Sequence, residues 1–243
     1  MDKLKKKKGP LIFEKIKYED YKNEEGITEI YRNEDWNLIV PLILDAVDHN
    51  KTKENNYGNY PYFRPRTKGD FLPKLDVPSD ILSALQLKEL YEFLPDDHQY
   101  SNLNRVFSIS VDGSSLKTFY DKCQEVNNSI LVVKDDEGNI FGGYSSERFE
   151  STRNFMGTGE CFLFTFYKGN KIHVFKSTGL NRFYIYCDDE QICFGCSDDY
   201  FSLCLSNNFL NGYSQKTQTY DNENLTKSDK FIITKLELWG FEG

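Results

Sequence analysis

The C-terminal two-thirds of the chain consists of short apolar segments separated by turn residues, and this pattern restricts the possible folds most. In the clearest segment every second residue is a large ring, at Phe162, Phe164 and Phe166. Successive side chains of a strand point to opposite faces, so we expect one face of this strand to lie in the core. The same pattern predicts strands at 130–134, 140–144, 161–167, 172–175, 183–187, 192–195 and 231–239.

Two short helices are predicted before and beside these strands. Ser79 or Asp80 can cap the first, which ends before Pro95. Its expected apolar positions are Ile81, Leu82, Leu85 and Leu90. The second begins near Ser115 and has one apolar face, made by Leu116, Phe119, Tyr120 and Cys123. Because Gly, Asn and Asp turns join the strands, the predicted class is α+β, with two antiparallel β-sheets packed as a sandwich and short flanking helices.

The first 78 residues differ from the rest in composition and in the spacing of their apolar residues. Helical spacing of apolar residues around Trp36 predicts a helix there, which Pro41 starts or kinks. Residues 51–78 are rich in Asn, Gly and Pro, and connections of more than about 15 residues are uncommon inside a compact domain. We therefore expect a partly helical N-terminal extension and linker over residues 1–78 and a domain over residues 79–243.

The net charge of −8 disfavours nucleic-acid binding, which depends on cations that neutralise phosphates. The Lys-rich start of the chain, Lys3 and Lys5 to Lys8, is a solvated terminus or a weak contact with an anionic membrane surface. No segment reaches the ~20 apolar residues that span a bilayer. We expect a cytoplasmic protein without an integral membrane segment, a location compatible with mitochondrial or nuclear pools, in which the cysteines stay reduced.

Residue patterns typical of catalytic or metal sites are incomplete. Cys193 and Cys196 form a C-x-x-C without a second close pair, so buried thiols are favoured over zinc, and redox sensing stays open. The three histidines, His49, His98 and His173, accompany no G-x-S-x-G motif. Glu147 and Glu160 are either a carboxylate pair for hydrolysis or surface charge. No metal, cofactor or catalytic residue is predicted.

Six fragments in fixed order carry a family resemblance. Two of them are F-G-G-Y-S-S-E at 141–147 and G-T-G-E-C-F-L-F-T-F at 157–166. The others are D-G-S-S-L at 112–116, L-V-V-K-D at 131–135, F-K-S-T-G at 175–179 and L-E-L-W-G-F at 236–241. Together they resemble the TLDc domain of oxidation-resistance proteins, over residues 79–242. The structural positions of this motif are Gly113, Ser115, Gly142, Gly195, Trp239 and Gly240. The chain departs from the family pattern at Cys193, Cys196 and Cys204.

The resemblance implies a non-catalytic protein-interaction module that contributes to oxidative-stress resistance. Its first-choice partner is the peripheral sector of the V-type proton ATPase. Binding is expected at loops along one rim of the sandwich, where strand ends bring together Glu147, Gly157, Gly159, Glu160, Asp188 and Asp189. The alternative is an enzyme, either a thiol-based peroxide reductase or a carboxylate-based hydrolase.

Overall fold

The computed structural model describes residues 71–166, 171–198 and 200–242. The predicted helix around Trp36, His49 and the Lys-rich start lie outside the described residues. The described residues all belong to one compact unit. Residues within 71–77 already contact it, because Leu75 forms a parallel bridge with Leu103 and Phe71 packs against Tyr91. The domain boundary at residue 78 stays a prediction.

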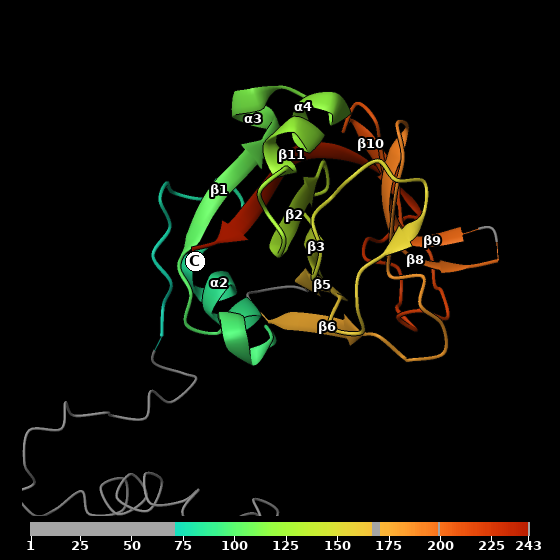
Figure 1. The fold of residues 1–243 in the computed structure, drawn as a ribbon, viewed down its shortest axis with the longest axis horizontal. Helices are drawn as coiled ribbons and strands as arrows, with labels where there is room; N and C mark the ends of the chain where they lie inside the picture. Colours follow the sequence, from blue (N-terminus) through green and yellow to red (C-terminus); the bar gives the residue numbers. More distant parts are fainter. Residues whose placement is uncertain (1–70, 167–170, 199, 243) are drawn as a thin grey trace, which may run out of the picture. The chain divides into compact units, whose positions relative to one another are not determined.

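Two antiparallel sheets build this unit, which confirms the predicted α+β sandwich (Figure 1). The first sheet has the order β1-β11-β2-β3-β5-β6. Its strands are β1 (Leu103–Ser108), β11 (Lys230–Phe241), β2 (Ser129–Asp135), β3 (Ile140–Ser145), β5 (Phe162–Phe166) and β6 (Ile172–Lys176). The second sheet has the order β4-β7-β8-β9-β10-β11. Its other strands are β4 (Phe155–Met156), β7 (Ile185–Cys187), β8 (Gln191–Ser197), β9 (Tyr200–Ser206) and β10 (Asn211–Tyr213).

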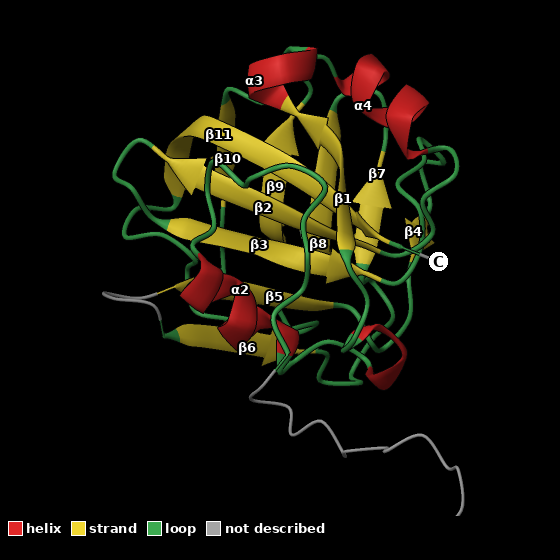
Figure 2. Cartoon of the chain, turned by 90° about the vertical axis from the view of Figure 1, so that its left-hand side faces the viewer, coloured by secondary structure: helices red, strands yellow, loops and turns green. Residues whose placement is uncertain are grey.

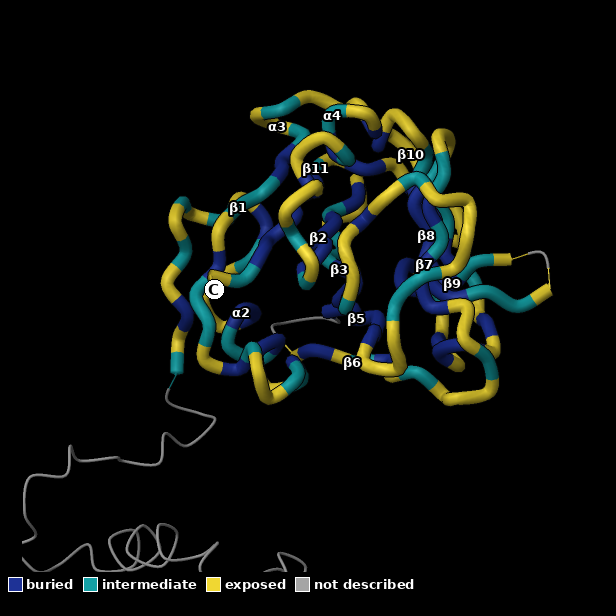
Figure 3. The backbone as a smooth tube through the Cα atoms, in the orientation of Figure 1, coloured by how far each residue is buried: buried dark blue, intermediate teal, exposed yellow. Residues whose placement is uncertain are grey.

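The long strand β11 joins the two sheets. Its first residues, 230–232, pair with β10, and its remaining residues pair with β2 and β1. Between the sheets lies the larger core cluster, to which β2 contributes Leu131 and β8 contributes Phe194. The strands that enclose it are largely buried, whereas the connecting loops are largely exposed (Figure 3).

The ring-bearing strand faces a second core, on the outer side of the first sheet. Phe162, Phe164 and Phe166 pack there with Trp239, whereas Leu163 points between the sheets. This outer face is covered by the helix α2 (Ala84–Tyr91), which crosses it in Figure 2. The alternation of rings therefore identified a buried face correctly, and this face needs a helix to cover it.

The predicted start of the first helix is wrong. Helix α2 begins after Ser83, which forms a reciprocal capping box with Gln86. Leu85, expected in the core, is 61% exposed, while Leu87 and Leu90 are buried. The predicted cap residues bind the buried Glu237 of β11, through the Ser79 hydroxyl at 2.6 Å and the Asp80 amide at 2.7 Å. The Ser79 oxygen also accepts the Leu82 amide at 2.9 Å, so it caps only the turn that precedes α2. A single turn of 3-10 helix, η6 (Asp96–His98), follows α2.

The second helix agrees with the prediction. The short helix α3 (Ile109–Asp112) ends at Gly113, which has a φ of +79°. Ser115 then caps α4 (Leu116–Cys123) by accepting a hydrogen bond from the Thr118 amide at 3.4 Å. The buried face of α4 closes the inter-sheet core at one end, through Leu116, Phe119 and Cys123.

Two of the motif glycines occupy positions where a side chain would collide with neighbouring atoms. At Gly142 a Cβ atom would overlap the carbonyl of Leu131 on the adjacent strand. Gly195 combines a φ of +63° with a close approach to Ser202 and Tyr220. Close strand pairing and a left-handed backbone are the conditions that favour glycine. Among the described residues, no helix has the length and apolar character that a membrane span requires.

Candidate functional site

A polar contact network fixes the loop between β3 and β5. The Ser146 hydroxyl accepts hydrogen bonds from the Thr158 amide at 2.9 Å and from the Thr158 hydroxyl at 3.0 Å. The same oxygen lies 3.3 Å from the Cys161 sulfur. Gly157 has a φ of +95°, which turns the chain back toward this contact. As a result the strand end that bears Glu147 is held next to the segment that bears Gly157, Gly159 and Glu160.

The loop encloses a shallow hollow of about 490 Å³. Its lining combines carboxylate, guanidinium and amide groups with two apolar side chains: Asn127, Ser146, Glu147, Arg148, Glu150, Thr152, Asn154, Phe155 and Met156. Glu147 lines this hollow, and Glu160 does not. A glycosidase needs two carboxyl groups on either side of one bond. The predicted pair Glu147 and Glu160 does not share this hollow, and its other carboxylate, Glu150, is paired with Arg148 at 2.8 Å.

The turn between β7 and β8 is tied to the same loop. Asp189 accepts hydrogen bonds from Ser151 and Arg153, both at 2.8 Å. These two contacts lower the pKa of the Asp189 carboxyl. Asp188 has a local role, because its carboxylate accepts the amides of Glu190 and Gln191 at 2.8 and 2.9 Å and so shapes the turn.

Charges along this end of the sandwich are unevenly neutralised. The two cations of the loop are used internally, since Arg148 pairs with Glu150 and Arg153 pairs with Asp189, each at 2.8 Å. Within residues 71–166, 171–198 and 200–242, no ion pair involves Glu147 or Glu160. Both side chains are exposed. We call the carboxylates along this end, Glu147, Glu150, Glu160, Asp188 and Asp189, the acidic rim.

Exposed rings lie beside the acidic rim, and the sequence patterns did not predict them. Phe155 on β4 is 38% exposed and Phe183 before β7 is 43% exposed. Their ring centroids are 4.5 Å apart, and Phe155 also lies 5.4 Å from Tyr186. The sequence did contain a signal for their exposure, because each ring lies in a polar segment: Phe155 follows Asn154, and Phe183 follows Arg182. Clustered exposed rings are typical of protein interfaces.

The described histidines pack against rings. His98 stacks on Phe241 with a centroid distance of 4.2 Å, and burial lowers its pKa although Asp97 and Glu160 act in the opposite direction. His173 stacks on Phe175 at 4.5 Å. Stacking of this kind gives both imidazoles a packing role on the surface of the first sheet.

The C-x-x-C cysteines do not converge. Cys193 is buried on β8 opposite Cys204 of β9, whereas Cys196 lies opposite Phe201 and is partly exposed. In the part of the chain that the structure describes, no group of three or more His, Cys, Asp or Glu side chains could hold a metal ion.

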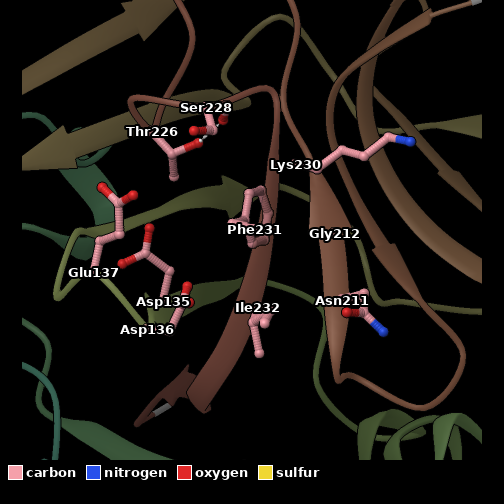
Figure 4. Close-up of a pocket in the computed structure, with 10 residues that line it drawn as sticks. All are labelled: Asp135, Asp136, Glu137, Asn211, Gly212, Thr226, Ser228, Lys230, Phe231 and Ile232. Atoms are coloured by element: carbon pink, nitrogen blue, oxygen red, sulfur yellow. Dashed lines mark hydrogen bonds between the residues drawn. The ribbon is translucent and has the colours of Figure 1, made fainter.

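A second hollow, of about 390 Å³, lies between the β2–β3 turn and the start of β11 (Figure 4). Two of its three carboxylates, those of Asp135 and Glu137, have structural partners. Asp135 binds the Asn139 amide at 2.7 Å and the Asn139 side chain at 2.6 Å. Glu137 pairs with Lys227 at 3.4 Å. These contacts hold the turn, so the hollow offers less unpaired charge than the acidic rim.

The two-sheet fold, with its loop motif between β3 and β5, defines a class of protein domain. The TLDc domain family model matches residues 75–242, and the chain belongs to this family. Among relatives, Oxidation resistance protein 1 of Rattus norvegicus is 36% identical over 173 residues, which cover 71% of this chain and 20% of the relative. Nuclear receptor coactivator 7 of Homo sapiens is 33% identical over 174 residues, covering 71% of this chain and 18% of that protein. The match therefore spans about a fifth of each relative's length.

Proposed function

We propose that this protein is a non-catalytic interaction module that binds a basic protein surface through its acidic rim. The proposed partner is the peripheral sector of the V-type proton ATPase, and the proposed location is the cytoplasm. Family membership supports the choice of partner, since the resemblance to TLDc proteins implies it. The name Oxidation resistance protein 1 supports a contribution to oxidative-stress resistance.

One observation carries this proposal: two exposed carboxylates, Glu147 and Glu160, lie outside any ion pair of the described residues, and Glu147 shares a hollow with the exposed ring of Phe155. Glu147 and Glu160 have no cation partner in that part of the chain, so their charge is available to a partner. Phe155 and Phe183 offer apolar area that a partner can desolvate. Binding energy in protein interfaces concentrates in a few such rings, while charges steer the encounter and set specificity.

The chemistry of the site also favours binding over catalysis. The hollow contains one of the two candidate carboxylates, and the described histidines are engaged with rings. Burial raises the pKa of the Cys193 and Cys161 thiols, so neither is activated as a thiolate.

Affinity capture with the full chain tests the proposal. The tagged protein is expected to enrich peripheral subunits of the V-type ATPase from a lysate that preserves the complex. The double charge reversal Glu147→Lys with Glu160→Lys should reduce this capture at least tenfold. Its thermal unfolding should stay nearly unchanged, because both side chains are exposed.

The matched control is Glu92→Lys, an exposed glutamate at the end of α2 and outside the acidic rim. It changes charge without touching the proposed surface, so capture should be retained. Failure of the unmodified protein to enrich these subunits would refute the choice of partner. Equal capture by the rim variant would refute the acidic rim as the binding surface.

A further inference from the structure

Two cysteines face one another across neighbouring strands of the second sheet. Cys193 of β8 and Cys204 of β9 are directly opposed in the antiparallel register. They point away from the inter-sheet core, since their neighbours Ile192, Phe194, Leu203 and Leu205 belong to it. Their sulfur atoms are 2.6 Å apart. The two thiols therefore form a preassembled pair.

The backbone at this pair suits a disulfide without rearrangement. Directly opposed residues of antiparallel strands have Cα atoms about 4.5 or 5.5 Å apart, and disulfides bridge Cα separations of about 4.4–6.8 Å. The sulfur–sulfur distance must shorten by about 0.5 Å to reach the covalent length near 2.05 Å. Small side-chain rotations supply that change.

We propose that Cys193 and Cys204 are a redox modification site, which a hydroperoxide converts into a cross-strand disulfide. The Cys204 thiolate attacks hydrogen peroxide, so a sulfur–oxygen bond forms and the oxygen–oxygen bond breaks. Cys204 becomes a sulfenic acid, and the departing hydroxide takes up the proton that Cys204 released, which gives the first water. The Cys193 sulfur then attacks that sulfenic sulfur, the disulfide forms, and hydroxide leaves and takes up the Cys193 proton. In sum, two thiols and one hydrogen peroxide give one disulfide and two waters.

The exposure of the two cysteines indicates which sulfur reacts first. Cys204 is 4% exposed and Cys193 is 0% exposed, so Cys204 is the sulfur that a small oxidant reaches first. The Gln191 side-chain oxygen lies 3.2 Å from the Cys204 sulfur. Burial raises the pKa of the Cys193 thiol, which disfavours its thiolate as the first attacker and leaves Cys193 as the resolving cysteine.

No other cysteine on a described strand lies directly opposite a second cysteine. The cross-strand neighbour of Cys187 is Ile192, and that of Cys196 is Phe201. Cys161 lies against the Ser146 hydroxyl at 3.3 Å. Cys196 is partly exposed, so it is the thiol that would react first if accessibility alone governed oxidation. We therefore expect peroxide to oxidise the buried pair Cys193 and Cys204 in preference to the more exposed Cys196.

Peptide mapping of the oxidised full-length protein tests this selectivity. The protein is treated with hydrogen peroxide, its remaining thiols are alkylated in denaturant, and it is cleaved before aspartate. This cleavage separates peptide 189–197, with Cys193 and Cys196, from peptide 199–220, with Cys204. The expected product is a linkage between these two peptides, with two fewer alkylated thiols than in the untreated protein.

The variant Cys196→Ser removes the ambiguity within peptide 189–197 and should leave the linkage intact. Cys204→Ser should abolish it, while Cys161→Ser, another buried thiol, should not. Mapping of the unsubstituted protein and of Cys196→Ser decides the matter even if another variant fails to fold. Linkage that is lost with Cys196→Ser, linkage between chains, or oxidation of Cys196 alone would overturn the proposal.

Discussion

Gly195 combines a left-handed backbone with a position where a Cβ atom would collide with Ser202 and Tyr220. Gly195→Ala should therefore lower the free energy of unfolding by about 3 kcal/mol or more, from backbone strain of ~1–2 kcal/mol plus overpacking of ~1–3 kcal/mol. Gly138 has a φ of +84°, but a Cβ atom there would meet no other atom within 4 Å, so Gly138→Ala should cost only the strain. Urea unfolding of both variants measures the difference. Equal losses would contradict the packing contribution.

His98 should make stability depend on pH. Burial against Phe241 lowers its pKa, so between the lowered pKa and the ordinary value near ~6.5 the unfolded chain binds a proton that the folded chain does not. Its contribution to the free energy of unfolding is present above pH ~6.5 and falls as the pH drops through that window. His98→Phe keeps a ring on Phe241 and should flatten the pH dependence between about pH 7.5 and 5.5. Urea midpoints that change identically in both proteins would contradict this.

Part of the acidic rim could be predicted from the sequence alone. The glycines and glutamates between β3 and β5 could be grouped, because the motif places them at adjoining strand ends. The role of Asp189 could not be predicted, since it depends on partners as distant in sequence as Ser151 and Arg153. Phe155 and Phe183 were missed because their proximity arises only when β4 pairs with β7.

At the level of elements, α2 shows how the outer core is closed. Leu90 is fully buried against the outer face of the first sheet, whereas Leu85 is 61% exposed on the same helix. Leu90→Ala should lower the free energy of unfolding by about 2–5 kcal/mol, from lost burial and the cavity left behind. Leu85→Ala is the matched control and should change it by less than about 0.5 kcal/mol. Denaturant titration compares the two, and a comparable loss at Leu85 would contradict the orientation of α2.

Strands with strong local patterns were predictable, and strands defined by pairing were not. The segments at β2, β3, β5, β6 and β11 carry apolar runs or alternating rings, and their expected ranges agree with the structure to within a few residues. β10 has only three residues and exists because it pairs with both β9 and β11. The start of α2 was misjudged because Ser79 and Asp80 bind the distant Glu237, a contact that local capping rules cannot anticipate.

For the whole molecule, the acidic rim requires the sandwich as a rigid support. The β3–β5 loop is held internally by the contact of Ser146 with Thr158, and Arg153 ties it to Asp189 in the β7–β8 turn of the second sheet. Binding through exposed carboxylates should weaken as salt rises, because screening reduces the attraction between exposed charges. Phe155→Ala should instead weaken binding at all salt concentrations by speeding dissociation. Surface plasmon resonance at several ionic strengths measures both, and binding that is insensitive to salt would contradict a charged interface.

The proposed docking surface of this domain is formed by Glu147 and Glu160. Its most direct test is a titration of the purified V-type ATPase peripheral sector with the full chain and with the Glu147→Lys, Glu160→Lys double variant. We expect saturable binding by the unsubstituted chain and a Kd at least tenfold higher for the double variant, with the same unfolding temperature for both. Equal Kd values would contradict the proposed docking surface, and no binding by the unsubstituted chain would contradict the proposed partner.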